Sequence, residues 1–106
     1  MRLGVMCSGN GTNFENIVTN PNCNKHEVVL MIHNTKQCGA VKRAAKWGIP
    51  HVRIPHKEED RMIEMFKVWN VDLIILAGYM RVLKIHLHFL VLLLTFIHHY
   101  YQSIKD

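Results

Sequence analysis

Four short apolar runs, each followed by a polar or helical stretch, constrain this chain more than any other feature. The runs are residues 2–7, 27–33, 50–54 and 71–77. Their lengths and apolar content are typical of buried strands. Between the first two runs, Thr12 or Asn13 is suited to cap a helix, and further helical patterns cover residues 38–47 and 57–69. Strands and helices that alternate with short connections predict an α/β, Rossmann-like three-layer fold around a parallel sheet.

Composition and charge narrow the class of protein. The chain is 49% hydrophobic and 20% charged, which fits one small globular domain. Its net charge of +5 suits an anionic ligand, but the basic residues are scattered, so no nucleic-acid partner is predicted. Cys7, Cys23 and Cys38 form no CxxC pair, which indicates reduced thiols and a cytoplasmic protein. The apolar run Phe89–Ile97 is shorter than the roughly 20 residues that span a bilayer.

The segment Ser8–Asn13 joins the first predicted strand to the first predicted helix. Gly9 and Gly11 let the backbone turn tightly and approach a ligand closely. The helix start that follows offers N–H groups and a partial positive charge, which suit a phosphate. The segment has neither the GxGxxG pattern nor the ending of a P-loop. Chemistry alone leaves two interpretations open, a site for a single phosphate and a plain strand-to-helix turn.

A second candidate segment, Leu76–Leu83, follows the fourth predicted strand. Ligands of parallel α/β sheets bind at the carboxyl ends of the strands, where both candidate segments fall. The Gly78 carbonyl and nearby backbone groups are suited to hydrogen-bonding a flat heterocycle. The alternative is that Met80, Val82 and Leu83 are core residues and Arg81 is a surface cation.

Taken together, the two segments resemble phosphoribosylglycinamide formyltransferases. The resemblance rests on CSGNGTNFENIV at residues 7–18 and VDLIILAGYMRVL at residues 71–83. The intervening VVLMIHNTK and AVKRAAKWGIPHVRIPH are similar to the family's second strand, second helix and third strand. The resemblance covers residues 1–83, and we expect these to form one formyltransferase-type subdomain.

That resemblance implies a function and a set of site residues. The family transfers a formyl group from 10-formyltetrahydrofolate to glycinamide ribonucleotide in purine synthesis. It implies that Gly11, Thr12 and Asn13 hold the substrate phosphate. It also implies that the folate pocket is lined by Met80, Arg81, Val82 and Leu83. No metal is implied, and neither the resemblance nor the composition indicates an oligomeric state.

The family's catalytic Asn and His lie downstream, in an Asn-Ile-His-Pro-Ser-Leu-Leu-Pro motif, and an Asp follows later. The present sequence has none of these; residues 84–106 have no resemblance to the family. Codons for Thr95–Gln102, however, permit that same motif when they begin one nucleotide earlier. We therefore expect residues 84–106 to be an out-of-frame tail, and the chain to be a truncated, inactive formyltransferase.

The tail also admits other interpretations. Its histidines, His86, His88, His98 and His99, lack the spacing of a zinc motif, and no cysteine lies nearby. We expect the tail to show low order or to form a loosely packed helix, and the edge of the fourth strand to be open unless the tail covers it. The alternative function is a non-catalytic phosphate-binding or interaction module whose apolar tail docks a partner.

Overall fold

The computed structural model describes residues 1–9, 11–20, 26–35, 39–79, 85 and 89–93. Its strands are β1 (Arg2–Cys7), β2 (Glu27–His33), β3 (His51–Arg53), β4 (Leu73–Ala77) and β5 (Leu90–Leu93). Its helices are α1 (Thr12–Thr19), α2 (Gly39–Lys46) and α3 (Glu59–Val68). The strands form one sheet in the order β3-β2-β1-β4-β5, and every neighbouring pair is parallel. The predicted parallel α/β fold is confirmed.

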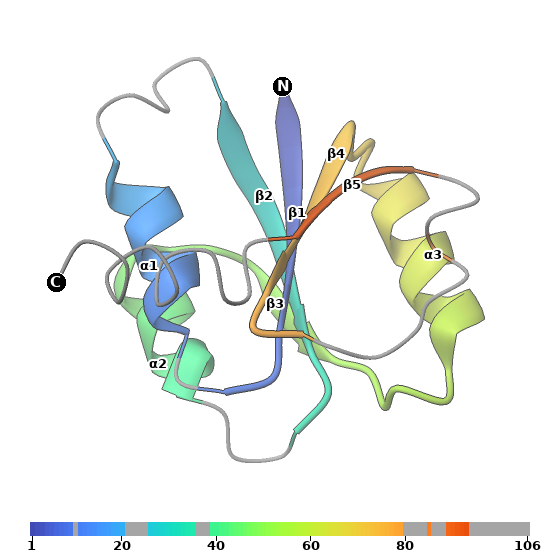
Figure 1. The fold of residues 1–106 in the computed structure, drawn as a ribbon, viewed down its shortest axis with the longest axis horizontal. Coiled ribbons are helices and arrows are strands. Elements are labelled where there is room, and N and C mark those ends of the chain that lie inside the picture. The colour runs from blue at the N-terminus through green and yellow to red at the C-terminus, as the bar shows by residue number, and fades with distance from the viewer. Residues whose placement is uncertain (10, 21–25, 36–38, 80–84, 86–88, 94–106) are drawn as a thin grey trace, which may run out of the picture.

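The sheet separates two apolar clusters, one beneath each set of helices. Figure 1 shows α1 and α2 on one side of the sheet and α3 on the other. Along β1, Leu3, Val5 and Cys7 belong to the cluster on the α1–α2 side, whereas Met6 belongs to the cluster on the α3 side. Successive strand residues point to opposite faces, so a strand covered on both faces is apolar throughout. This is why β1, β2 and β4 appear in the sequence as continuous apolar runs.

On the α3 side of the sheet, the Phe66 ring lies close to the backbone of β1 at Gly4. A Cβ added at Gly4 of β1 would lie 2.5 Å from Cε1 of Phe66. Glycine at this position therefore allows the Phe66 ring to lie directly on the strand. The helical pattern predicted for α3 is confirmed, since Met62, Ile63 and Phe66 are buried and Trp69 packs against the same cluster.

The fifth strand corrects the expectation for residues 84–106. Leu90–Leu93 pairs with Leu73–Leu76 of β4, so these four residues are neither unstructured nor helical. The edge of β4, expected to be open unless the tail covered it, is covered over this stretch by the tail. An apolar, partly β-branched segment satisfies the backbone groups of an edge strand whatever its origin, because ladder hydrogen bonds do not depend on side-chain identity. The rest of the tail lies outside the described residues.

Candidate functional site

The loop that follows β1 is built around Gly11. Gly11 has φ +79° and is the N-cap of α1, with no side chain supplying a capping hydrogen bond. The prediction that Thr12 or Asn13 caps this helix is therefore wrong. The left-handed conformation favours glycine, and it lets the chain enter the helix without a side-chain cap. The Glu15 N–H donates to the Gly11 carbonyl at 2.9 Å, so the N–H groups of the first turn before it have no acceptor within the helix.

The same loop is held against the start of α2. The Ala40 N–H donates to the Gly9 carbonyl at 3.3 Å. A Cβ added at Gly11 would lie 2.5 Å from the Ala40 Cα. No side chain fits between these two backbones. The loop is therefore shaped by a contact between segments that are far apart in the sequence.

A hydrogen bond joins the loop after β1 to the segment after β4. The Ser8 hydroxyl donates to the Gly78 carbonyl at 2.6 Å. This carbonyl, the candidate acceptor for a heterocycle, thus accepts one hydrogen bond from within the protein and keeps a second lone pair. Tyr79, the next residue, is fully buried on the α3 side. The predicted folate-pocket residues Met80, Arg81, Val82 and Leu83 lie outside the described residues.

The carboxyl end of β2 brings further polar groups to this end of the sheet. His33 is buried, and its Nδ1–H donates to the Thr35 carbonyl at 3.0 Å. Burial lowers the pKa of His33, the hydrogen bond to Thr35 opposes this change, and nearby His51 and Arg53 add to it. Next to it, the Asn34 Oδ1 and Thr35 Oγ1 atoms are buried without a hydrogen-bond partner among the described residues.

His33, Asn34 and Thr35 were not among the site residues predicted from the sequence. No local pattern marks them, because Asn and Thr after a strand are ordinary turn residues. Their place beside the loop follows from the pairing of β2 with β1, which the sequence does not print. The one signal available in the sequence was their position at the end of an apolar run.

Glu15 of α1 is hydrogen-bonded to Arg43 and Trp47 at the end of α2, a contact that we call the α1–α2 clasp. Glu15 accepts hydrogen bonds from Arg43 Nη1 at 2.7 Å and from Trp47 Nε1 at 3.0 Å. The Trp47 hydrogen bond lowers the pKa of Glu15, and Arg43 and Lys46 add to the effect against the opposing effect of desolvation. Because the clasp joins the first turn of α1 to the end of α2, it keeps these helices side by side beneath the loop.

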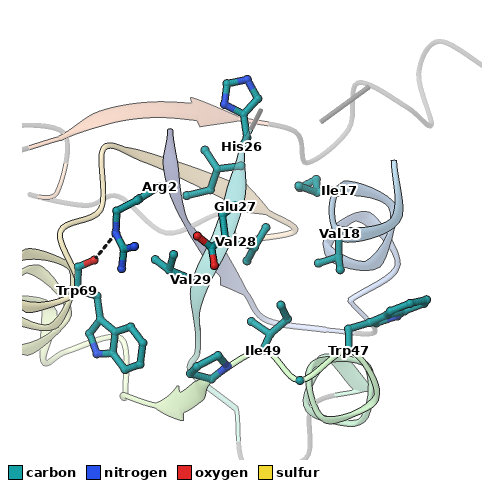
Figure 2. A pocket seen from close by; sticks show the side chains of 13 residues that line it. Arg2, Ile17, Val18, His26, Glu27, Val28, Val29, Trp47, Ile49 and Trp69 are labelled. Carbon is teal, nitrogen blue, oxygen red and sulfur yellow. Dashed lines mark hydrogen bonds between the residues drawn. The ribbon is translucent and has the colours of Figure 1, made fainter. Parts of the chain in front are cut away.

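A pocket of about 450 Å³ lies at the opposite, amino end of the sheet. Figure 2 shows Arg2 and Trp69 on one side of it and Ile17, Val18 and Trp47 on the other. The Arg2 Nε–H donates to the Trp69 carbonyl at 3.0 Å. Gly11, Thr12 and Asn13 do not line this pocket, so it is separate from the candidate phosphate site.

Two further findings concern metals and membranes. Within the described ranges, no group of three or more His, Cys, Asp or Glu side chains is arranged to hold a metal ion. In the same part of the chain, none of the helices has the length and apolar character needed to cross a membrane.

Comparisons with known proteins agree with this architecture. The chain is 29% identical over 98 residues to the chloroplastic phosphoribosylglycinamide formyltransferase of Arabidopsis thaliana, covering 81% of this chain and 33% of that protein. It is 33% identical over 91 residues to the phosphoribosylglycinamide formyltransferase of Bacillus subtilis, covering 77% of this chain and 47% of that protein. The chain thus spans between a third and a half of the length of these two relatives.

A solved structure with the same fold covers nearly all of the chain. The phosphoribosylglycinamide formyltransferase of Bacillus halodurans superposes with a TM-score of 0.75 at 27% identity, covering 99% of this chain and 65% of that one. A model of the family described as formyl transferase matches residues 1–91. This match extends over most of the chain and includes β1 to β4 with the loops at their carboxyl ends. The chain therefore belongs to the formyl transferase family.

Proposed function

We propose that this chain is the substrate-phosphate half of a cytoplasmic phosphoribosylglycinamide formyltransferase of purine biosynthesis. In this proposal the phosphate of glycinamide ribonucleotide is held by Gly11, Thr12 and Asn13. The pocket for 10-formyltetrahydrofolate, the formyl donor, is lined by Met80, Arg81, Val82 and Leu83. The relatives' names support the reaction and the nucleotide substrate.

One observation carries the phosphate site: the conformation of Gly11. Its φ of +79° and its contact with Ala40 place the backbone, rather than a side chain, at the start of α1. The first N–H groups of that helix are then available to an anion, which the helix dipole also favours. The position agrees with the general rule that parallel α/β sheets bind ligands at the carboxyl ends of their strands.

The proposed chemistry needs groups that this sequence does not contain. Formyl transfer passes through a tetrahedral oxyanion, which hydrogen-bond donors stabilise while a general base manages the amine proton. The family's Asn-Ile-His-Pro-Ser-Leu-Leu-Pro motif is absent from the 106 residues. Loss of a single oxyanion donor lowers the rate by about 10²–10³-fold. We therefore expect this 106-residue chain to bind its substrate without turning it over.

Calorimetric titration with glycinamide ribonucleotide, together with a formyl-transfer assay, tests this function. We expect weak binding and no turnover by the 106-residue chain. Gly11→Val should abolish binding, because a β-branched residue is strained at φ +79° and collides with Ala40. The matched control is Gly48→Val, since Gly48 also has a positive φ but has open space around it. Measurable turnover, or unchanged binding by Gly11→Val, would contradict the proposal.

We also propose that the chain divides after Leu83 into a family subdomain, residues 1–83, and an out-of-frame tail, residues 84–106. A one-base correction near the Lys84 codon should restore the missing motif and give an active formyltransferase. A stop codon ahead of that motif in the corrected frame would refute this account. The tail would then be better explained as the docking segment of a non-catalytic module.

A further inference from the structure

The pocket at the amino end of the sheet has the size of a small-molecule site. Its volume of about 450 Å³ lies within the range of about 300–1,000 Å³ that is usual for such sites. Because it lies at the opposite end of the sheet from the candidate phosphate site, a ligand bound there would be a second ligand of the chain. The side chains that line the pocket indicate the chemistry of that ligand.

Two side chains of opposite charge line this pocket without pairing with each other. Arg2 of β1 and Glu27 of β2 are partners in the parallel register, so their side chains point to the same face of the sheet. Figure 2 shows both among the side chains around the pocket. Both residues belong to the part of the chain that the structure describes, and no ion pair joins them there.

Contacts with the corner between α3 and β4 hold Arg2 in place. Its backbone N–H donates to Asp72 Oδ2 at 2.8 Å, and its Nε–H donates to the Trp69 carbonyl at 3.0 Å. Its two Nη groups have no hydrogen-bond partner among the described residues. The protein thus orients the guanidinium and leaves it donors that suit a carboxylate.

Much of the remaining lining is apolar and includes two indole rings on opposite sides of the pocket. Figure 2 shows Trp69 on one side and Trp47, with Ile17, on the other. The Trp47 Nε1–H donates to Glu15 at 3.0 Å, yet this residue is 44% exposed. An indole that is held in place but half in water offers an apolar surface that an aromatic ligand would cover.

One class of small molecule matches all of these groups. A carboxylate suits Arg2, an ammonium suits Glu27, and an aromatic body suits the apolar lining between Trp47 and Trp69. We propose that this pocket binds a free α-amino acid with an aromatic side chain. An aromatic acid or an aromatic amine would leave one of the two protein charges without a partner. This inference does not depend on the proposed phosphate site.

Three probes with the same phenyl ring and different charges test the proposal. Phenylalanine has both charged groups, hydrocinnamate lacks the ammonium, and phenethylamine lacks the carboxylate. Trp47 and Trp69 are the two tryptophans of the chain, so tryptophan fluorescence reports occupancy of the pocket. We expect the 106-residue chain to bind phenylalanine at least about tenfold more tightly than either analogue, because each analogue loses a charge-assisted hydrogen bond.

Two variants identify the side chain that recognises each charge. Glu27→Gln should weaken phenylalanine binding about tenfold and leave hydrocinnamate binding unchanged. Arg2→Gln should weaken the binding of phenylalanine and of hydrocinnamate and leave phenethylamine binding unchanged. Arg53→Gln and Glu64→Gln are the matched controls, since both side chains are exposed and neither lines the pocket. These controls should leave all three affinities as they are.

The fold does not obscure the result, because Glu27 is exposed and Glu27→Gln should leave the unfolding midpoint unchanged. Equal affinity for the three probes would show an apolar pocket that does not recognise charge, and would overturn the inference. An equal loss of phenylalanine and hydrocinnamate binding in Glu27→Gln would overturn it too. So would the absence of any phenylalanine binding at millimolar concentrations.

Discussion

β4 and β5 are neighbouring apolar strands of one sheet, but they are held in different ways. In β4, Ile74 and Leu76 are fully buried or nearly so, and the strand pairs with β1 on one side and β5 on the other. β5 pairs only with β4 among the described strands, and Leu90 is 66% exposed. Ile74 and Leu76 thus contribute packing in the centre of the sheet, whereas Leu90 at its edge contributes mainly backbone pairing. Matched substitutions in packed and open positions can test this difference.

The largest expected difference is between the two strands themselves. Leu76→Ala, in β4, should lower the free energy of unfolding by about 2–5 kcal/mol, because it leaves a cavity in the α3-side cluster. Leu90→Ala, in β5, should change it by less than about 0.5 kcal/mol, since most of that side chain is already in water. Denaturant unfolding measures both. Equal losses would show that β5 is a core strand despite its place at the edge.

A smaller difference is expected between two glycines. Both Gly11 and Gly48 have positive φ, but only the Gly11 position would bring a Cβ against the Ala40 backbone. Gly48→Ala should cost about 1–2 kcal/mol, the usual strain of a left-handed residue. Gly11→Ala should cost about 1–3 kcal/mol more, because the loop and α2 must move apart. Thermal unfolding of the two variants gives this difference directly, and identical midpoints would mean that the contact with Ala40 is easily relaxed.

The smallest expected effect concerns pH and the buried His33. The pKa of His33 is lowered in the folded chain, chiefly by burial, so the unfolded chain takes up a proton more readily. The contribution of neutral His33 to the free energy of unfolding is present above the ordinary pKa of about 6.5. It is lost as the pH falls below that value. His33→Asn should flatten the fall in unfolding free energy as pH drops below about 6.5. A slope unchanged by His33→Asn would contradict the assignment.

Much of the fold could be predicted from the sequence because its signals are local. Continuous apolar runs indicate strands that are buried on both faces. The spacing of Met62, Phe66 and Trp69 indicates which side of α3 is buried. The glycines of Ser8–Asn13 marked the loop, and the family resemblance was confirmed by a match over residues 1–91. The assignments of Gly11–Asn13 to phosphate and of Met80–Leu83 to folate remain predictions.

The sequence by itself determined the order of elements, the parallel sheet and the side that each helix buries, since periodicity along the chain records which face avoids water. Only the tertiary structure placed β5 beside β4, made Gly11 the helix cap, and joined Ser8 to the Gly78 carbonyl. It also buried the oxygens of Asn34 and Thr35 beside the loop. These features depend on which distant segments become neighbours, and contacts between residues that are far apart in the chain leave no periodic trace in it.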